Sequence, residues 1–503
     1  MIELMIHLDA SSRVPLYGQI YEYIRLHIAD GKISRGEKLP STRLLASHLQ
    51  ISRSTVELAY EQLLSEGYIE SRPYRGYYVN DISGLYLSGK GRMLQSAATQ
   101  EQPEHAAGTE AVPVRIDFSP NRNEMKFFPY SVWRRISKNV LAEDDPELFL
   151  SGEAAGEMEL RKAICGYLYH ARGVNCTPDQ LIVGAGNEYL LILLSQVLGT
   201  DRTVVMENPT YLQAYHTLTH MHYHVTGVSR DAEGICMEDI RHTDPDIVYT
   251  MLSHQFPMGT VMPMKRRLEL LQWAAEKENR YIIEDDHDSE FRYKGKPIPS
   301  LQGNDTMHTV IYIGTFSKSI GSAIRVSYMV LPEKLLADYH ANCGFYSSTV
   351  PKEQQRMLTA FLEQGSFERH LNRMRGIYKN RHDLFLRMLR NENWVHRIYG
   401  DHAGMHLLVE AESALSAEEL VHCVREQGIR IYALEEFMIP GESSPAMEYP
   451  TLVLGYGALE EEDMLQGIRC IRDVIRTQGQ KEEPEEMSGS DGEQKRSVRC
   501  RKL

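Results

Sequence analysis

The chain has 503 residues, of which 42% are hydrophobic and 25% charged, an ordinary globular composition. This length exceeds one typical domain and allows two or three. The formal net charge of −14 argues against a protein that binds nucleic acid over its whole surface. It still allows one basic module, because binding depends on local charge.

The sequence indicates no membrane segment, disulfide framework or metal site. The N-terminus carries Glu3 and Asp9 and has no long apolar core, so we expect no secretory signal. No run of about 18 apolar residues occurs. The cysteines form no Cys-x-x-Cys pair and no His/Cys cluster, which predicts reduced thiols in a cytoplasmic protein and no zinc site. There are seven of them: Cys165, Cys176, Cys236, Cys343, Cys423, Cys470 and Cys500.

Residues 13–80 begin with three short amphipathic helices. Apolar positions at helical spacing predict the first helix from Pro15 to Ala29. Ser41 is expected to cap a second helix that runs through Leu49, and Ser52 a third that runs from Arg53 to Ser65. The inner face of the second helix is expected to carry Leu44, Leu45 and Leu49.

Two short alternating runs, 67–71 and 76–79, follow these helices and predict a β-hairpin. Helices and a hairpin in this order are typical of a winged helix–turn–helix domain. From Arg13 to Asn80 there are nine Lys/Arg and seven Asp/Glu, a net charge of +2. This segment is therefore the candidate for the basic module.

The rest of the chain divides into a linker, a large domain and a tail. Residues 81–114 lack apolar periodicity and predict a flexible linker. Residues 115–478 alternate strand-like runs with helical stretches, which predicts an α/β fold with a mostly parallel sheet. Residues 479–503 mix charged, Gly and Ser residues and predict a disordered tail. The strand-like runs are 181–183, 203–206, 247–249, 281–283 and 310–313.

Two of these strands end in residues suited to an aldehyde cofactor that carries a phosphate. Lys318 follows the run 309–313, is flanked by hydroxyl residues and precedes Arg325 by seven positions. A lysine amine can form a Schiff base, while hydroxyls and a guanidinium can hold a phosphate. The strand at 281–283 continues into three carboxylates, and one of them could keep a pyridine nitrogen protonated. Together the two strands look like the core of a fold-type I pyridoxal 5′-phosphate (PLP) enzyme.

The segment from Leu39 to Val56 resembles the GntR family of bacterial regulators, and the resemblance extends over residues 13–80. It implies a double-stranded DNA operator as partner and places Arg43 on the positioning helix. The recognition helix would open with Arg53, Ser54 and Thr55, and the wing tip would be formed by Arg72, Arg75 and Gly76. The alternative is a protein-interaction module whose arginines form only a solvated face.

The whole chain, apart from linker and tail, resembles the MocR/GabR-type subfamily. There a GntR-like winged helix precedes a fold-type I aminotransferase-like domain, and the resemblance implies PLP as cofactor and a homodimer with shared sites. Lys318 matches the Schiff-base lysine and Asp285 the partner of the pyridine nitrogen, although Asp286 remains an alternative. The phosphate cup would contain Arg325, Thr315 and Ser317.

The same resemblance implies two further groups of cofactor residues. Gly186, Asn187 and Glu188 precede an apolar helix, and their backbone N–H groups could hold phosphate at its N-terminus. For Asn187 and Glu188 two alternatives stay open. They contribute only their backbone N–H groups, or their side chains contact the cofactor as well. Tyr211 matches a residue that lies near the cofactor, the alternative being a plain core aromatic.

The sequence departs from the subfamily pattern at two places. Many members carry Tyr where this chain has His287, and imidazole titrates near neutrality where a phenol does not, so we expect a cofactor spectrum that responds to pH. Aminotransferases also hold the substrate carboxylate with an arginine near the C-terminal strand, and residues 449–457 contain none. Gln213 stands where some relatives have Arg. Arg122 is a substitute candidate, or an ordinary loop arginine.

These features favour a PLP-dependent transcriptional regulator that senses PLP or a PLP–amine adduct, with a small amine or amino acid as effector. An active PLP-dependent aminotransferase with an accessory DNA-binding domain is the alternative. The missing carboxylate arginine weakens it, so we expect at most residual aminotransferase activity. A third reading, a DNA-binding protein with a cofactor-free scaffold, is disfavoured because Lys318, Asp285 and Arg325 are all present.

Overall fold

The computed structural model divides into two compact units, Met1–Glu110 and Ala111–Leu503. It describes residues 14–73, 75–80, 112–142, 144–293, 298–442 and 447–479, together with Leu4, Ile6, Leu8, Asp9 and Ser12. Most of the predicted linker, residues 81–111, and nearly all of the predicted tail, residues 480–503, lie outside this described part.

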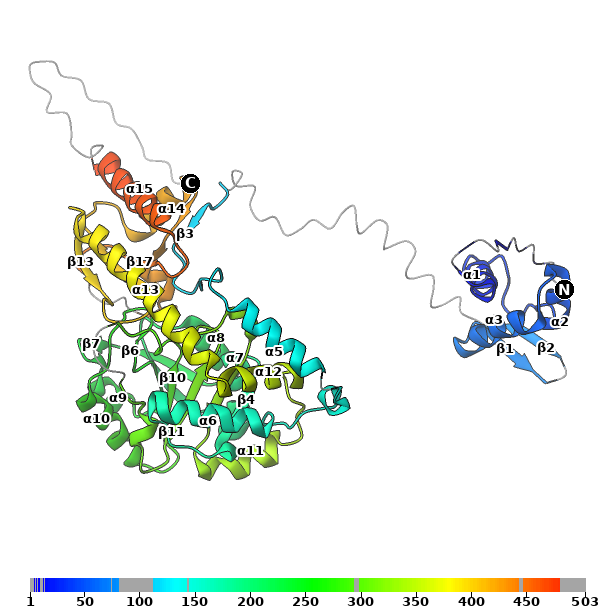
Figure 1. Ribbon diagram of the computed structural model, residues 1–503, viewed down its shortest axis with the longest axis horizontal. Coiled ribbons are helices and arrows are strands. Elements are labelled where there is room, and N and C mark those ends of the chain that lie inside the picture. Colours follow the sequence, from blue (N-terminus) through cyan, green and yellow to red (C-terminus); the bar gives the residue numbers. More distant parts are fainter. Residues whose placement is uncertain are drawn as a thin grey trace, which may run out of the picture. The chain divides into compact units, whose positions relative to one another are not determined.

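In the described part of the first unit, three helices are followed by a two-stranded hairpin (Figure 1). Ser41 and Ser52 cap α2 and α3 as predicted, accepting hydrogen bonds from the Leu44 and Thr55 amides at 3.2 and 3.3 Å. Leu45 is buried, but the prediction for Leu44 is wrong, because its side chain is 49% exposed. The elements are α1 (Leu16–Ala29), α2 (Thr42–Leu49), α3 (Arg53–Ser65), β1 (Ile69–Arg72) and β2 (Gly76–Val79).

The second unit is built on a seven-stranded sheet (Figure 1). All neighbouring strands run parallel except β12, which is antiparallel to both of its neighbours, so the predicted mostly parallel α/β sheet is confirmed. In spatial order the strands are β4 (Leu181–Gly184), β12 (Ser327–Val330), β11 (Val310–Thr315), β10 (Tyr281–Asp286), β9 (Ile247–Thr250), β5 (Thr203–Glu207) and β6 (His224–Val228).

Helices cover both faces of this sheet, and successive strand residues point to opposite faces. Tyr281 and Ile283 pack in the cluster that contains α7 (Asn187–Leu198), α8 (Leu212–His220) and α11 (Leu336–Cys343). Ile282 packs on the other face, against α10 (Met264–Ala275). That second face is also covered by α5 (Tyr130–Ala142), α6 (Met158–Arg172), α12 (Lys352–Glu363) and the start of α13 (Ser366–Arg390).

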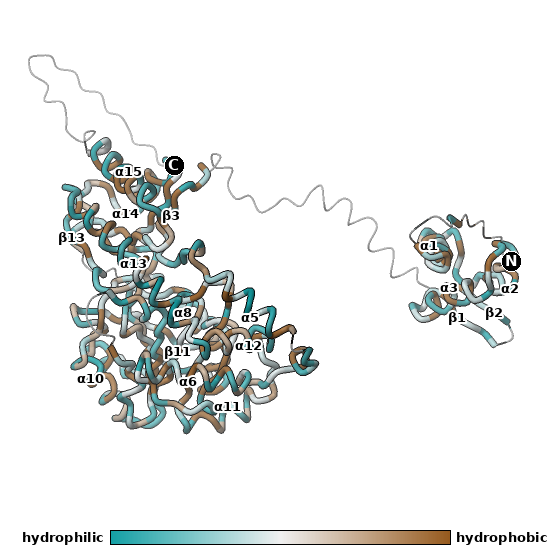
Figure 2. The backbone as a smooth tube through the Cα atoms, in the orientation of Figure 1, coloured by the Kyte–Doolittle hydropathy of each residue, from teal (hydrophilic) through white to brown (hydrophobic). Residues whose placement is uncertain are grey.

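A smaller antiparallel sheet with two helices also belongs to the unit. Its strands are β13 (Val395–Tyr399), β14 (His406–Ala411), β17 (Thr451–Gly455) and β16 (Tyr432–Ala433), packed with α14 (Ala417–Glu426) and α15 (Glu461–Gly479). Teal and brown alternate along the helices in Figure 2, as expected where one face of each helix is buried. Among the described residues, no helix has the length and apolar character needed to cross a membrane.

Candidate functional site

A cavity of about 220 Å³ opens beside the ends of β10 and β11. It is lined by all of the predicted cofactor residues except Gly186, which is the N-cap of the adjoining helix α7. The parallel strands explain this convergence, because their carboxyl ends meet at one edge of the sheet. The lining residues are Asn121, Asn187, Glu188, Tyr211, Gln213, Met251, Phe256, Asp285, His287, Thr315, Ser317, Lys318, Ser322, Arg325 and Ser327.

Lys318 projects into this cavity from the turn after β11. Its Nζ donates a hydrogen bond to Asn121 Oδ1 at 2.6 Å. Burial lowers the pKa of Lys318 to about 8, although the carboxylates of Asp288 and Asp285 favour the charged form. A substantial fraction of this amine is therefore neutral near pH 8, and a neutral amine is the form that attacks an aldehyde.

Asp285 is buried at the end of β10, on the face that α7 covers. It accepts a hydrogen bond from Tyr249 Oη and a second, at 3.3 Å, from Asn187 Nδ2. Burial raises the pKa of Asp285, against the opposing effects of His287 and Tyr249. A buried carboxylate at the floor of a cavity can bind a protonated ring nitrogen strongly, since little water competes with it.

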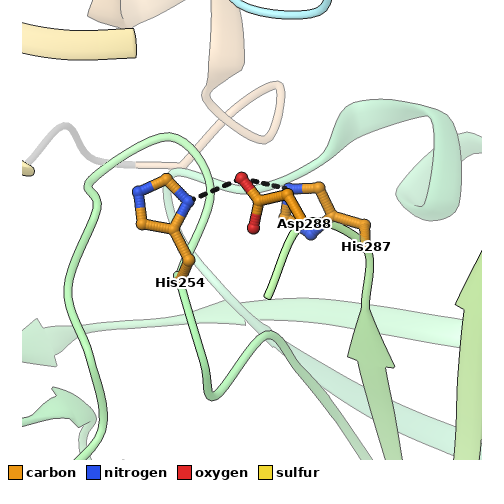
Figure 3. A group of neighbouring side chains, drawn as sticks. All are labelled: His254, His287 and Asp288. Carbon is orange, nitrogen blue, oxygen red and sulfur yellow. Dashed lines mark hydrogen bonds and ion pairs between the residues drawn. The ribbon is translucent and has the colours of Figure 1, made fainter. Parts of the chain in front are cut away.

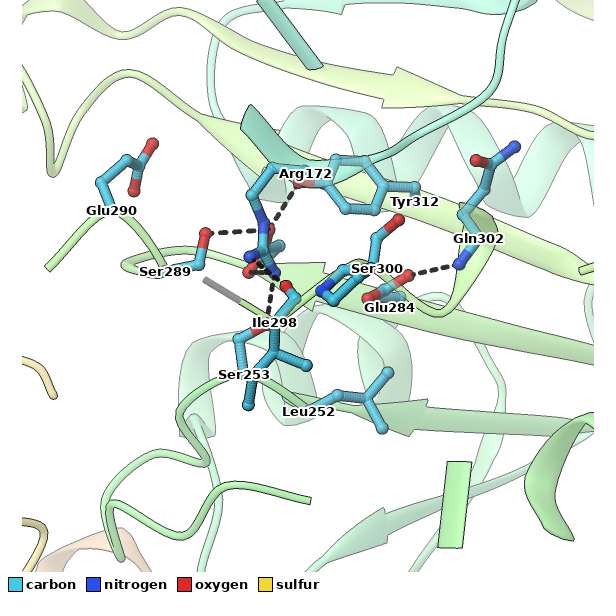
Figure 4. Close-up of polar contacts among 12 residues, drawn as sticks. Arg172, Leu252, Ser253, Glu284, Ser289, Glu290, Ile298, Ser300, Gln302 and Tyr312 are labelled. Carbon is cyan, nitrogen blue, oxygen red and sulfur yellow. Dashed lines mark hydrogen bonds and ion pairs between the residues drawn. The ribbon is translucent and has the colours of Figure 1, made fainter. Parts of the chain in front are cut away.

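Asp286 points to the opposite face of β10 and is buried among polar partners, of which Figure 4 labels Arg172, Tyr312 and Ser289. Arg172 Nε donates to Asp286 Oδ2 at 2.7 Å, and Tyr312 Oη donates to the same oxygen at 2.6 Å. Burial alone would raise the pKa of Asp286, but Arg172 and Tyr312 hold it below its ordinary value. Arg172 also donates to Ser253 Oγ and the Ile298 carbonyl. Asp286 therefore faces away from the cavity, and Asp285 faces into it.

The predicted phosphate cup brings Arg325 against the start of α7. Arg325 Nη2 donates to Glu188 Oε2 at 3.0 Å and to the Ala185 carbonyl at 3.3 Å. Gly186 has a φ of +112°, and a Cβ built there would lie 2.1 Å from Arg325 Nη2. A side chain at Gly186 would displace this guanidinium, so the helix N-terminus and the arginine share one concave site.

Hydroxyl groups complete the cup beside Arg325. Thr315 Oγ1 accepts hydrogen bonds from the Ser317 amide at 3.1 Å and from Ser327 Oγ at 2.9 Å. Ser317 Oγ and Asn187 Oδ1 are buried without a hydrogen-bond partner among the described residues. Buried polar atoms are normally satisfied, so these two indicate a polar ligand.

His287 belongs to a buried group that the sequence did not reveal (Figure 3). Asp288 Oδ2 lies 2.8 Å from His254 Nδ1 and 3.6 Å from His287 Nε2. Burial would raise the pKa of Asp288, but the two imidazoles hold it well below its ordinary value. His254 lies more than thirty residues away along the chain, so no local pattern marks the cluster. Asp288 thus lies between His254 and His287, beside the cavity.

Several cavity residues were not predicted, and one candidate lies elsewhere. Asn121 lines the cavity from the loop before α5 and Met251 from the loop after β9, and Gln213 also lines it. Arg122 is exposed and does not line the cavity, although its neighbour Asn121 does. Among the described residues that line the cavity, Arg325 is the single arginine.

The predicted DNA contacts lie on one helix pair and one hairpin of the first unit. Arg43, Arg53 and Ser54 are exposed, and Arg53 Nε pairs with Glu57 at 2.7 Å. Thr55, at the same helix start, hydrogen-bonds the capping Ser52 hydroxyl through its own Oγ1 at 2.8 Å. These positions suit a recognition helix whose first turn faces a groove.

The hairpin ends in a basic turn. Arg72 and Arg75 are exposed, and the Arg72 guanidinium stacks 4.4 Å from the Tyr78 ring centroid while pairing with Glu70 at 2.6 Å. Gly76 pairs with Arg72 across the hairpin and has a φ of +96°, which glycine adopts readily. The fold and the site thus define a winged helix–turn–helix regulator joined to an aminotransferase-like domain.

Comparisons with known proteins give the same two parts. Residues 16–79 match the gntR family of bacterial regulatory proteins, and residues 117–444 match aminotransferase class I and II. The chain is 38% identical over 466 residues to the HTH-type transcriptional regulator YdeL of Bacillus subtilis, covering 92% of this chain and 98% of the relative. It is 32% identical over 482 residues to the probable rhizopine catabolism regulatory protein MocR of Rhizobium meliloti, covering 94% and 96%.

Solved structures agree on the fold of the larger unit. A multiple substrate aminotransferase from Thermococcus profundus superimposes with a TM-score of 0.65 at 23% identity, covering 74% of this chain and 93% of that one. The chain belongs to the MocR/GabR-type subfamily of GntR-family transcriptional regulators, and it is a DNA-binding regulator with an aminotransferase-like domain.

Proposed function

We propose that this regulator binds PLP at Lys318 and that PLP, or its adduct with a small amine or amino acid, changes its affinity for a DNA operator. The observation that carries the proposal is one cavity that contains a lysine, a buried carboxylate and an arginine at a helix N-terminus. A ligand that binds two arrangements of a protein unequally shifts the equilibrium between them.

The residues fit PLP in charge and in shape. Arg325, Thr315 and Ser317, with the N-terminus of α7, would hold the phosphate, and the unpartnered Ser317 hydroxyl would gain a partner. Asp285 would hold the ring nitrogen and His287 would lie near the ring oxygen, while Tyr211 would pack near the ring. PLP supplies an aldehyde for the lysine amine and a ring that withdraws electrons.

The cavity suits a sensor better than a transaminase. A transaminase needs a cation for the substrate carboxylate in addition to the one for the phosphate, ideally a bidentate arginine. Among the described lining residues Arg325 is the one arginine, and Glu188 and the phosphate cup already engage it. Gln213, in the wall of the cavity, is neutral and supplies no cation for a substrate carboxylate. We therefore expect amine exchange, if any, to be slow.

We further propose that the protein acts as a homodimer, because two winged helices would then contact two half-sites of an operator. The target genes are not implied by the family. One relative is named for rhizopine catabolism and another, PdxR of Corynebacterium glutamicum, 28% identical, for pyridoxine biosynthesis.

The test begins with capture of genomic DNA by the purified full chain, with and without PLP. Operator affinity is then measured by fluorescence anisotropy for the wild type and Lys318→Ala, with Lys126→Ala, an exposed ion-paired lysine, as control. We expect PLP to change operator affinity at least about 5-fold in the wild type and control. Lys318→Ala should lose both this response and visible absorption.

Two outcomes would contradict the proposal. Equal operator affinity with and without PLP, in a protein that absorbs in the visible, would remove the sensing function. Several turnovers per second with any ordinary amino acid would favour the alternative, an aminotransferase with an accessory DNA-binding domain.

A further inference from the structure

Two cysteines outside the cofactor cavity lie in direct sulfur contact. Cys165 is on α6, and Cys176 is on the loop that follows this helix, and their Sγ atoms are 3.5 Å apart. Both side chains are half-buried. Among the six cysteines in the described part of the chain, these two alone form a sulfur–sulfur contact, and Cys343, for comparison, is buried and donates to the Leu193 carbonyl.

The surrounding elements hold the two sulfurs at this separation. Gly173 ends α6 with a φ of +66°, which reverses the chain, and the next residue, Val174, is buried in the core beside α6. Gln180 then fixes the segment after Cys176, because its side chain bonds the Thr177 amide at 3.0 Å and the Leu331 carbonyl at 3.0 Å. The thiols are therefore constrained neighbours.

The two thiols differ in their readiness to ionise. The Cys176 thiol donates a hydrogen bond to Cys165 Sγ, and this bond, assisted by the charge of Arg161, lowers the pKa of Cys165. The same bond raises the pKa of Cys176. A thiolate is the nucleophilic form of cysteine, and the charge of Arg161 favours it at Cys165, so we assign the first attack to this sulfur.

We propose that Cys165 and Cys176 form a redox site that a hydroperoxide closes to an intramolecular disulfide. The Cys165 thiolate attacks one peroxide oxygen and breaks the O–O bond, which gives a sulfenic acid and a hydroxide or alkoxide that takes up a proton. Cys176 then loses its proton, and its sulfur attacks Cys165 sulfur and displaces hydroxide, which leaves as water. Two thiols and one hydroperoxide thus give a disulfide, one alcohol or water, and one water.

The geometry requires little movement for this closure. A disulfide is about 2.05 Å long, so the sulfurs must approach by roughly 1.5 Å, a distance within reach of side-chain rotation. In intracellular proteins, disulfides of this kind are usually transient and redox-sensing. The ring closed by the disulfide would contain Arg172, the buried partner of Asp286 at the end of β10.

The test uses the full-length protein and dilute hydrogen peroxide as probe. Free thiols are alkylated under denaturing conditions and counted by mass spectrometry, and we expect the number to fall from seven to five. Trypsin cleaves after Lys162, Arg172 and Arg202, so the disulfide should appear as residues 163–172 joined to residues 173–202. Dithiothreitol should restore seven thiols.

Serine variants distinguish the sulfur that attacks the peroxide, Cys165, from the sulfur that closes the disulfide, Cys176. Cys176→Ser should leave Cys165 as a sulfenic acid that dimedone traps, whereas Cys165→Ser should react more slowly and form no cross-link. Cys236→Ser, a distant and equally half-buried cysteine, should behave like the wild type. Retention of seven thiols in the wild type, or first oxidation at cysteines other than this pair, would overturn the proposal.

Discussion

Adjacent carboxylates at the end of β10 have different environments because a strand turns successive side chains to opposite faces. Asp285 lies on the α7 side, where it lines the cavity and accepts bonds from Tyr249 and Asn187. Asp286 lies on the other side and forms a fully buried ion pair with Arg172, whose side chain is 5% exposed. The first is open to the cavity, whereas the second is enclosed in an ion pair.

Asparagine substitutions should separate these two roles. Asp285→Asn removes a buried charge from the cavity floor, so we expect PLP retention to fall at least about tenfold, with little loss of stability. Asp286→Asn leaves Arg172 buried without its counter-charge and should lower the free energy of unfolding by about 3–5 kcal/mol. Equilibrium dialysis with PLP and urea unfolding measure the two effects. If Asp286→Asn lowered PLP retention and Asp285→Asn lowered stability, Asp286 would be the residue that binds PLP.

Lys318 gives the cavity a pH dependence that an ordinary lysine would lack. Its pKa is lowered from 10.5 to about 8, so the neutral amine becomes abundant above that pH. The rate of PLP uptake by cofactor-free protein should rise about tenfold per pH unit below pH 8 and level off above it. Stopped-flow absorbance in the visible range measures this rate. A rate that still rises tenfold between pH 9 and 10 would mean that the lysine is not desolvated.

At the scale of elements, a substitution at the start of α7 would test the predicted phosphate cup. Gly186→Ala would place a methyl group within 2.1 Å of Arg325 Nη2, at a φ of +112° that alanine disfavours. Gly199→Ala, at the other end of the same helix, has a comparable strain at a φ of +75°, but nothing lies within 4 Å of its Cβ. We expect PLP retention to fall at least about tenfold in Gly186→Ala alone. Equal losses in both variants would indicate general destabilisation instead.

The positioning helix α2 and the recognition helix α3 make a second element-scale prediction. Arg53 and Arg72 are paired with Glu57 and Glu70, whereas the described ion pairs do not include Arg43. Replacing Arg43 or Arg53 with Ala should weaken binding about equally on different DNA sequences and reduce the salt slope by roughly one each. Glu61→Ala, on the exposed side of α3, is the control. Unchanged operator binding by the Arg43/Arg53 double variant would remove this assignment.

Local sequence signals predicted most helices and strands, because helix caps and apolar runs depend on residues that are close together in the chain. Ser52 marked the start of α3 correctly, since a capping hydroxyl satisfies a free backbone amide. Five apolar runs were recognised as strands, because parallel strands covered on both faces are apolar throughout. β6 was missed because it is an edge strand with four partly or fully exposed positions, two of which carry His and Thr.

The cavity was predicted less completely, because tertiary folding assembles it. The Asp285 motif lies at the end of a strand and the Lys318 motif directly after one, so both could be recognised locally. Asn121 and Met251 reach the cavity from loops that carry no motif, and the His254–Asp288 pair joins distant segments. No pattern along the sequence predicts these loop positions or the contact between His254 and Asp288.

At the scale of the whole molecule, an exposed apolar surface indicates where a second copy could bind. Phe149 and Phe345 are 74% and 76% exposed, unusual values for phenylalanine. They lie on neighbouring segments, since a Cβ at Gly152 would be 3.6 Å from Ser348 Cβ. The Thr349 hydroxyl accepts a bond from the Ala185 amide at 3.1 Å, beside the phosphate cup. A second copy bound here would cover this apolar surface beside the cavity, in the dimer that we propose.

We therefore expect Phe345→Glu to convert a dimer to a monomer, because burying a carboxylate at an apolar interface is unfavourable. Light scattering should give about twice the 57.6 kDa chain mass for the wild type and about that mass for the variant. Leu268→Glu, at an exposed apolar position of α10, should remain dimeric. The monomer should also lose tight binding to operators with two half-sites, while retaining weaker binding to one half-site. A wild-type monomer with PLP bound would contradict the dimer, and a dimeric Phe345→Glu variant would place the interface elsewhere.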